Sequence, residues 1–530
     1  MKQPRVRHPP RRTSRGDPHK QKELDPGSGP GMTGCRRSPR PAVGGTRDDK
    51  HLMQRTLIKD TPKKVGEKVL VQGWVHRRRN LGKMIFFDLR DRSGFLQVMV
   101  HPNDIGEECP SRLERAEAGM ALAKELRPEF CIGISGVIQK RNEKNVNQEM
   151  PTGTVEMVAK EIVVYSKSET PPFEIGNEDR QANEELRLKY RYLDLRHERM
   201  QKNIRLRDRV TAFFRTWLGQ KDFVEIETPM LMRGDARGAG AREFVVPSRL
   251  HKGKFYVLPQ SPQQFKQLLM VSGFERYFQI ARCIRDEDPR GDRQPEFTQL
   301  DLEMSFVERE DVISLTEELM IEMVRTVTPE KRIQQVPFPR FSYQEVMAKY
   351  GTDKPDLRQD KNDPNLLAFC WVVDFPFFEK TEAGGWIFTH NPFSAPKPEH
   401  MEWLLKKEHI GEILTTQYDI VLNGYEVGGG SIRNHRPEAL RSVFEIMGLS
   451  DEQITSQFGH MLEAFSYGAP PHGGIAPGID RLVMILANEP NIREVIAFPK
   501  TGDARDPLMG APAEISPEQL KELGITIYDT

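Results

Sequence analysis

Short runs of alternating apolar and polar residues fill the first part of the chain, between Leu57 and Val164. Turn residues separate the runs, which is the pattern of half-buried β-strands. The expected strands are Val69–Val75, Ile85–Leu89, Leu96–Val100, Cys131–Ile138 and Thr154–Val164. The stretch Glu108–Glu125, rich in Ala, Leu and Glu, predicts one helix between the third and fourth strands. We therefore expect a small five-stranded β-barrel over residues 53–168.

The second part of the chain follows a different pattern. Apolar residues recur near a 3.6-residue period over His197–Gly219, which predicts an amphipathic helix. Strands and helices then alternate irregularly, with a hairpin-like pair at Glu243–Val246 and Phe255–Leu258. The interpretation is a hinge over residues 169–196, then an α+β domain on an antiparallel sheet over residues 197–530.

Residues 1–52 differ in composition from the rest. The first 50 residues hold 13 Lys and Arg against 5 Asp and Glu, with 8 Pro and 7 Gly, so we expect a disordered basic tail. An Arg-rich tail invites a transit-peptide interpretation, but the apolar face of such a helix is missing. A start at Met53 is the alternative. The remainder holds 65 basic against 72 acidic residues, so bulk charge does not predict a nucleic-acid partner.

Membrane and disulfide chemistry are not expected. No apolar run approaches the ~20 residues that cross a bilayer. The five cysteines, Cys35, Cys109, Cys131, Cys283 and Cys370, are scattered and form no Cys-x-x-Cys pair. A reducing cytoplasm is the expected location.

One charged hairpin carries the strongest chemical signal. Arg282–Asp288 is followed by the run Gln294–Glu303, in which charged and apolar residues alternate. In an antiparallel hairpin Gln299, Asp301 and Glu303 would share one face, while the Arg-rich turn could meet a polyphosphate. For an isolated run of this kind, a solvated charged hairpin is the simpler interpretation.

The neighbouring segments favour the functional interpretation. With the hairpin as the second motif, Phe223–Pro229 and Gly473–Leu482 resemble the first and third signature motifs of class II aminoacyl-tRNA synthetases, in the right order. Gln260–Lys266, Asn423–Arg433 and Phe498–Thr501 resemble the bacterial aspartate enzymes of that class. The resemblance covers about residues 55–530. It implies a class II catalytic domain joined to an OB-fold anticodon-binding domain, and a homodimer.

The resemblance also implies an ATP site that needs Mg²⁺. Arg285 and Arg481 would be the catalytic residues, since a guanidinium stays charged and binds phosphate by two parallel hydrogen bonds. Asp419 and Glu426 would hold the magnesium as hard oxygen ligands. The implied ATP-binding residues are Arg285, Asp286, Glu287, Gln294, Glu426, Gly478, Ile479, Asp480 and Arg481.

Selectivity for L-aspartate would come from cations. Lys266 and Arg433 match the family positions that face the substrate's side-chain carboxylate, and asparagine would leave both unpaired. The implied aspartate-binding residues are Gln263, Gln264, Phe265, Lys266, Arg285, Asp301, His390 and Arg433, with His390 on a closing loop.

The barrel would bind the anticodon of tRNA-Asp. Arg77, Arg78, Phe86 and Gln97 are the implied contacts, because guanidiniums and aromatic rings bind phosphates and unpaired bases. By alternation, one of Phe86 and Phe87 must be a core residue. Whether tRNA-Asn is also charged stays open, although a leucine at position 81 in the barrel loop favours discrimination against tRNA-Asn.

Three departures qualify the resemblance. Ala239 stands where the family has a Glu that binds the substrate ammonium group, with Asp235 nearby as a possible substitute. Asn391 replaces the second histidine of the closing loop. The large insertion domain of bacterial relatives is reduced to a short loop near residues 358–370. Two rivals remain open: an asparagine- or lysine-specific relative, and a non-catalytic RNA-binding protein that kept the fold.

Overall fold

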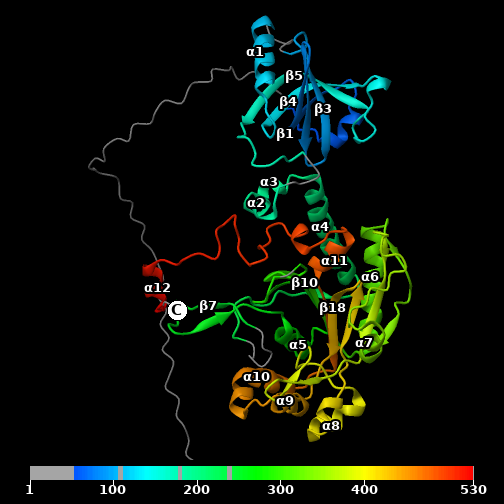
Figure 1. The fold of residues 1–530 in the computed structure, drawn as a ribbon, viewed down its shortest axis with the longest axis vertical. Coiled ribbons are helices and arrows are strands. Elements are labelled where there is room, and N and C mark those ends of the chain that lie inside the picture. Colours follow the sequence, from blue (N-terminus) through cyan, green and yellow to red (C-terminus); the bar gives the residue numbers. More distant parts are fainter. Residues whose placement is uncertain (1–52, 106–111, 177–181, 235–241, 290, 529–530) are drawn as a thin grey trace, which may run out of the picture.

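The computed structural model describes residues 53–105, 112–176, 182–234, 242–289 and 291–528. Figure 1 shows a small barrel at one end, a larger sheet-based body at the other, and short helices between them. The expected disordered tail 1–52 and the substitution at Ala239 lie outside the described residues. Among the helices described, none combines the length and the apolar character that a membrane crossing requires.

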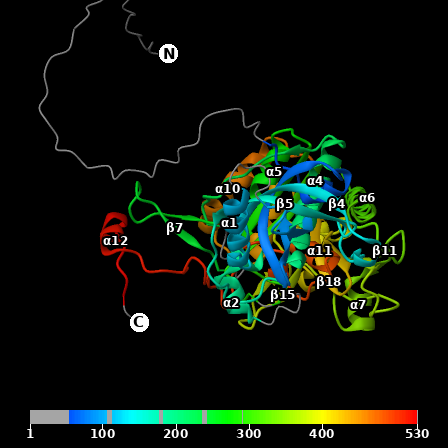
Figure 2. The ribbon, with the colours of Figure 1, turned by 90° about the horizontal axis from the view of Figure 1, so that it is seen from above.

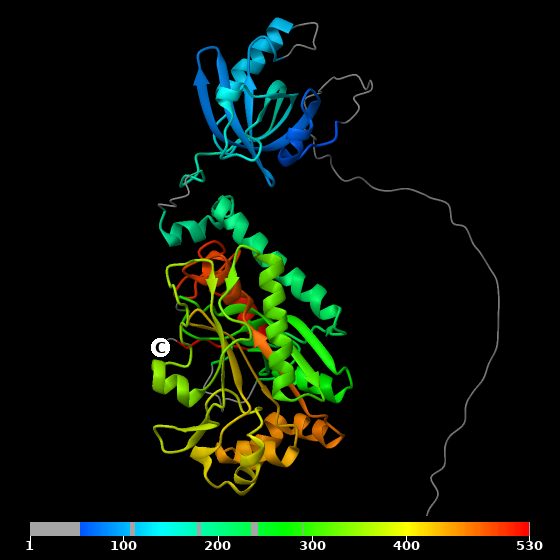
Figure 3. The ribbon, with the colours of Figure 1, turned by 90° about the vertical axis from the view of Figure 1, so that its right-hand side faces the viewer.

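The N-terminal body is the predicted five-stranded barrel. Its strands close in the order β1-β2-β3-β5-β4, with α1 beside them (Figure 3). The strands are β1 (Lys68–Leu81), β2 (Met84–Asp91), β3 (Gly94–Val100), β4 (Cys131–Lys140) and β5 (Val155–Ser166); the helices are α1 (Arg112–Glu125) and the 3-10 turns η1 (Ile58–Lys63) and η2 (Glu143–Asn145). Alternation along β2 buries Phe87 completely and leaves Phe86 on the outer face, as predicted.

Three helices connect the barrel to the second body. They are α2 (Glu184–Lys189), α3 (Arg191–Asp194) and α4 (Glu198–Gly219). Asn183 caps α2, since its side chain accepts a hydrogen bond from Leu186 N at 2.8 Å. Helix α4 has the predicted bounds to within one residue. Its apolar stripe, including Val210 and Phe214, packs into the core of the second body.

The second body is built on an eight-stranded sheet in the order β12-β14-β17-β18-β19-β10-β9-β6. All neighbours are antiparallel except β12 with β14 and β6 with β9. The strands are β6 (Val224–Glu225), β9 (Arg276–Ile284), β10 (Glu296–Ser305), β12 (Arg340–Ser342), β14 (Phe369–Val373), β17 (Tyr418–Leu422), β18 (Tyr425–Ile432) and β19 (His472–Pro477). This mostly antiparallel α+β body confirms the predicted fold class.

Helices cover the sheet on its two faces. On one face α4, α6 (Arg309–Val327) and α11 (Ile479–Leu486) form the main hydrophobic core with the strands. The other face carries α5 (Gln263–Val271), and beyond it α9 (Pro437–Ile446) and α10 (Asp451–Ser466) pack on each other. The functional side chains lie between this second layer and the sheet.

Smaller elements complete the body. They are β7 (Val245–Pro247) with β8 (Phe255–Val257), β11 (Arg332–Ile333) with β13 (Leu366–Leu367), β15 (Phe378–Lys380) with β16 (Trp386–Phe388), α7 (Tyr343–Tyr350), α8 (Met401–Lys406), α12 (Pro517–Leu523), and the turns η4 (Pro398–His400), η5 (Ile410–Glu412) and η6 (Ile492–Glu494). The β7–β8 hairpin and α12 project together to one side of the molecule in Figures 1 and 2.

Candidate active site

A polar cavity of about 540 Å³ opens between the sheet and the α5 layer. Six of the predicted aspartate-binding residues line it: Gln263, Lys266, Arg285, Asp301, His390 and Arg433. They come from α5, the loop after β9, β10, the loop before α8 and the end of β18. The fold therefore gathers into one cavity residues that are far apart in the sequence.

The floor of the cavity depends on close packing of glycine-rich strands. A Cβ on Gly430 would lie 2.2 Å from the carbonyl oxygen of Gly474 on β19. A Cβ on Gly474 would in turn lie 2.0 Å from the carbonyl oxygen of Leu302 on β10. Only residues without a side chain let these three strands approach so closely and keep the floor open.

A buried network of two cations and two carboxylates forms one end of this cavity. Lys266 Nζ lies 2.7 Å from Asp301 Oδ1 and 3.2 Å from Glu303 Oε2. Arg433 donates from Nε to Glu303 Oε1 at 2.8 Å and from Nη2 to Glu303 Oε2 at 3.0 Å. Each of these four side chains is at most 3% exposed, so the charges are held in place by one another.

The two carboxylates of the network respond differently to burial. Burial raises the pKa of Asp301, and Lys266 offsets only part of that cost. For Glu303 burial also disfavours the charge, but Arg433 and Lys266 outweigh it and lower the pKa to about 2. Glu303 is therefore the permanent counter-charge that places both cations, while Asp301 keeps Oδ2 buried and without a hydrogen-bond partner in the described structure.

Glu303 is the main functional residue that the motif comparison left without a role. Its position on the face shared with Asp301 was predicted from alternation, and the structure confirms that both side chains are buried. Charge balance was the available signal, because two buried cations need more than one buried carboxylate.

A second cavity of about 310 Å³ adjoins the first, and Arg285 lines both. Arg285 lies over the Phe297 ring, with its guanidinium carbon 5.0 Å from the ring centre. Its Nε is buried and has no partner among the described residues, and the same holds for Gln263 Nε2 and Arg481 Nε. Buried donors of this kind indicate a site shaped for a ligand.

The second cavity contains most of the predicted ATP-binding residues. Arg285, Glu287, Gln294, Glu426, Gly478, Asp480 and Arg481 line it. Arg481 Nη2 lies 2.8 Å from Asp292 Oδ2. Gln294 exchanges two hydrogen bonds with the backbone of Lys500, at 2.7 and 3.1 Å, which attaches the segment after α11 to the cavity wall.

Two predicted ATP residues, Ile479 and Asp286, do not line the second cavity, and Asp480 lines it but also has a structural role. The Asp480 carboxylate is nearly buried and accepts hydrogen bonds from Thr298 N at 2.7 Å and from Arg207. Ile479 is completely buried in the main core. Asp286 is exposed and does not line either cavity. Asp480 thus connects α4, β10 and α11, which positions Arg481 beside it.

An acidic pair is formed by Glu426, which lines both cavities, and Asp419, which is buried and is not among the residues that line either one. Asp419 on β17 accepts a hydrogen bond from Gln417 Nε2 at 2.8 Å, and its other oxygen lies 3.6 Å from His390 Nε2. The negative charge of Asp419, together with burial, raises the pKa of Glu426 on β18. Burial lowers the pKa of His390, but Asp419 outweighs it, so the net shift is upward.

The acidic pair fits a hard divalent cation. Two carboxylates that repel each other gain most when a cation binds between them. Within the described residues no group of three or more His, Cys, Asp or Glu side chains is arranged to hold a metal. A magnesium ion here would therefore complete its oxygen shell with water and phosphate, which suits a cation that arrives with a nucleotide.

Gln264 and Phe265 lie on α5 but outside the cavity lining. Gln264 Oε1 instead lies 2.7 Å from His460 Nε2 on α10. Asn391 lines the cavity, and its Oδ1 accepts a hydrogen bond from Phe393 N at 3.0 Å, which shapes the loop next to His390.

The outer face of the barrel holds a third cavity, of about 980 Å³. Arg77, Phe86 and Gln97 line it, with the exposed Leu81 at its edge. Arg78 does not line it, because its guanidinium binds the carbonyl oxygens of Lys124 and Leu126 at the end of α1. Three of the four predicted anticodon contacts therefore share one surface.

Comparison with known proteins identifies the family of each of the two bodies. Residues 183–502 match the family model described as tRNA synthetases class II (D, K and N), and residues 69–165 match the OB-fold nucleic acid binding domain. A curated relative from Rubrobacter xylanophilus, named Aspartate--tRNA(Asp/Asn) ligase, is 42% identical over 87% of this chain and 95% of its own. One of the same name from Dehalococcoides mccartyi is 39% identical over 88% and 98%.

Solved structures share the fold. A putative aspartyl-tRNA synthetase from Leishmania major Friedlin is 20% identical, with a TM-score of 0.66 over 86% of this chain and 96% of that one. An asparaginyl-tRNA synthetase from Pyrococcus horikoshii, complexed with asparaginyl-adenylate, is 23% identical, with a TM-score of 0.66 over 88% and 100%. The alignment with the Rubrobacter relative spans 587 positions, more than the 530 residues of this chain, so that relative contains segments that this chain lacks.

Proposed function

The chain belongs to the class II tRNA synthetases, within the aspartate–tRNA ligases, and from this we propose that it joins L-aspartate to tRNA at the expense of ATP. The observation that carries the proposal is the position of Arg285 in the wall of both cavities. One guanidinium there can bind the α-carboxylate of an amino acid and the α-phosphate of a nucleotide together. Holding the two reacting groups in one geometry is a major part of catalysis.

In the first step an oxygen of the aspartate α-carboxylate attacks the α-phosphorus of ATP, and the bond to pyrophosphate breaks. Arg285 neutralises charge on the α-phosphate as the new bond forms. Arg481 holds the far end of the triphosphate. Magnesium, held by Asp419 and Glu426, would neutralise charge on the phosphates. In the second step a ribose hydroxyl at the 3′ end of tRNA takes the aspartyl group and AMP leaves.

The buried cations support aspartate as the amino acid. Lys266 and Arg433 offer two positive charges at the closed end of the first cavity, where a side-chain carboxylate would pair with them. A neutral amide would lose the charge-assisted hydrogen bonds and would turn N–H donors towards these donors, and an ammonium offers them no acceptor. Pyrophosphate exchange without tRNA tests this directly: we expect exchange with aspartate, and exchange driven by asparagine or lysine would refute the assignment.

The barrel supports anticodon recognition. We propose that Arg77 contacts the phosphate backbone and that Phe86 and Gln97 meet anticodon bases in the third cavity. The names of the relatives favour tRNA-Asn as a second substrate, whereas the exposed Leu81 favours discrimination against tRNA-Asn. We propose dual charging, because relatives spanning most of this chain carry that name. Comparing tRNA-Asp and tRNA-Asn transcripts tests it, and charging of tRNA-Asp alone would refute it.

We further propose that the chain acts as a homodimer through the surface around β6. Large apolar side chains are exposed there, including Val224 (45%), Leu231 (52%) and Phe274 (46%). Contiguous exposed apolar residues are typical of protein interfaces. Light scattering after size exclusion should give twice the chain mass, and a monomer at micromolar concentration would contradict the proposal.

A further inference from the structure

The segment 491–500 borders the second cavity, which is the proposed nucleotide cavity, through the side chain of Ile492. It follows α11 and contains η6. Ile492 lines the cavity, and Lys500 binds Gln294, another lining residue, through its backbone N and O. The side chain of Ile492 is 2% exposed, so it also belongs to the main core. The path of this segment therefore sets part of the shape of the cavity.

Arg191 of the hinge helix α3 binds the backbone of this segment through hydrogen bonds from its guanidinium. Its Nη2 donates to Arg493 O at 2.5 Å and to Ile496 O at 2.8 Å, and its Nε donates to Ala497 O at 2.9 Å. The side chain is only 2% exposed. One planar guanidinium thus binds three backbone carbonyls of a segment that has no regular secondary structure after η6. A lysine ammonium cannot reproduce this geometry.

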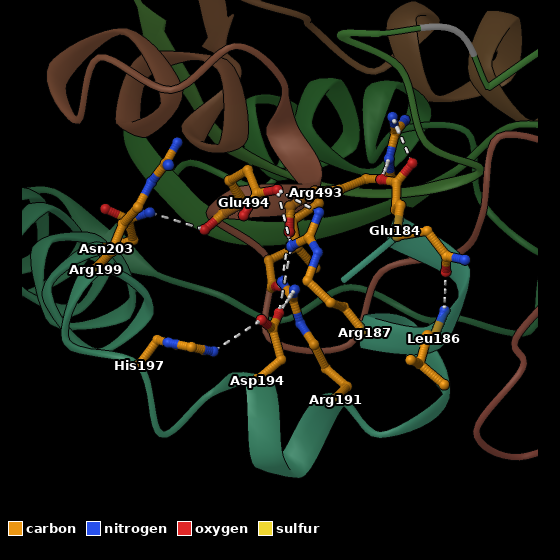
Figure 4. Close-up of polar contacts among 12 residues, drawn as sticks. Glu184, Leu186, Arg187, Arg191, Asp194, His197, Arg199, Asn203, Arg493 and Glu494 are labelled. Carbon is orange, nitrogen blue, oxygen red and sulfur yellow. Dashed lines mark hydrogen bonds and ion pairs between the residues drawn. The ribbon is translucent and has the colours of Figure 1, made fainter. Parts of the chain in front are cut away.

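An acidic partner orients Arg191. Its Nη1 donates to Asp194 Oδ2 at 2.5 Å, and Asp194 is completely buried (Figure 4). The network continues to both sides: Arg187 Nη1 lies 3.4 Å from Glu494 Oε1, and Arg493 pairs with Glu184. Hydrogen bonds to three carbonyls and one carboxylate hold the buried Arg191 guanidinium in one geometry. The hinge and segment 491–500 therefore behave as one unit.

We propose that Arg191 is a positioning residue for ATP. By fixing the carbonyls of residues 493, 496 and 497, it places Ile492 and Gln294 at the nucleotide. This inference rests on the proposed function, in which the second cavity holds ATP. Among the described residues that line the aspartate cavity, none comes from the hinge or from segment 491–500. Loss of the Arg191 side chain should consequently weaken ATP binding and leave aspartate binding unchanged.

The test is aspartate-dependent pyrophosphate exchange by the full chain, without tRNA, for wild type, Arg191→Lys and Arg191→Gln. Arg191→Lys keeps a positive charge opposite Asp194, so it preserves the fold if Arg191→Gln does not. We expect KM for ATP to rise about tenfold in Arg191→Gln and less in Arg191→Lys, because small misplacements of binding groups cost this much. KM for aspartate should change by less than about twofold.

Arg205→Gln is the matched control. Arg205 is an exposed arginine of α4 that donates to Arg92 O of the barrel at 3.1 Å, and it does not line the nucleotide cavity. The Arg205→Gln enzyme should therefore have the same KM for ATP as wild type. An unchanged KM for ATP in a folded Arg191→Lys, or equal rises for ATP and aspartate, would overturn the positioning role alone. Absence of exchange in wild type would instead overturn the proposed function, so the two failures are distinguishable.

Discussion

Replacing Glu303 by Gln should destabilise the catalytic domain, because Glu303 is the carboxylate between two buried cations. Its oxygens lie 2.8 and 3.0 Å from Arg433 nitrogens and 3.2 Å from Lys266 Nζ. The glutamine keeps the shape but removes the negative charge. Arg433 would then be a buried cation without this counter-charge, which is among the costly changes a protein interior can suffer.

The pKa of Glu303 gives the magnitude. It is lowered from 4.5 to about 2 in the folded chain. A difference of this size corresponds to roughly 3 kcal/mol of stability supplied by the ionised group at pH 7. Because the folded pKa is the lower one, this stability is fully present above about pH 4.5 and is lost as the pH falls towards 2.

The measurement is thermal unfolding of wild type and Glu303→Gln, with Glu322→Gln as the control. Glu322 pairs with Arg325 on the surface of α6 and should contribute less than about 1 kcal/mol. At about 2 °C per kcal/mol for a large domain, Glu303→Gln should lower Tm by about 6 °C. By pH 3.5 the free-energy difference should shrink to about 2 kcal/mol. An unchanged Tm at pH 7, or a difference that grows on acidification, would refute the reasoning.

Three further variants test the site itself. Arg285→Lys should lower kcat/KM for pyrophosphate exchange about a hundredfold, since an ammonium cannot bind carboxylate and phosphate in parallel; a loss below about threefold would contradict its role. Lys266→Met should raise KM for aspartate about a hundredfold with a smaller effect on KM for ATP, and equal effects on both would contradict a side-chain carboxylate site. Phe86→Ala should raise KM for tRNA about tenfold through lost base stacking, and an unchanged KM would place the anticodon elsewhere.

Local pattern was enough to predict the architecture. Alternation located all five barrel strands, and the structure extends the first from Val75 to Leu81, because its partner strand β2 continues the ladder. The 3.6-residue period located α4. These elements are predictable because each buries one face, and burial leaves a regular pattern in the sequence.

Side-chain partners were harder to predict than elements. Nothing in the local sequence says that Arg78 binds the end of α1, or that Gln264 contacts His460 on α10, because these partners come from distant parts of the chain. The role of Arg191 has the same origin, since its three carbonyl partners lie about 300 residues further along the sequence. Motifs identify which residue types meet a substrate, whereas the contacts that hold those residues depend on the folded geometry.

The most direct test of the central claim is ATP-dependent attachment of labelled aspartate to a tRNA-Asp transcript by the full chain with magnesium. Labelled asparagine and lysine serve as controls. The account predicts charging with aspartate alone, and loss of charging when ATP is omitted. Charging with asparagine or lysine, or tRNA binding without any charging, would contradict it.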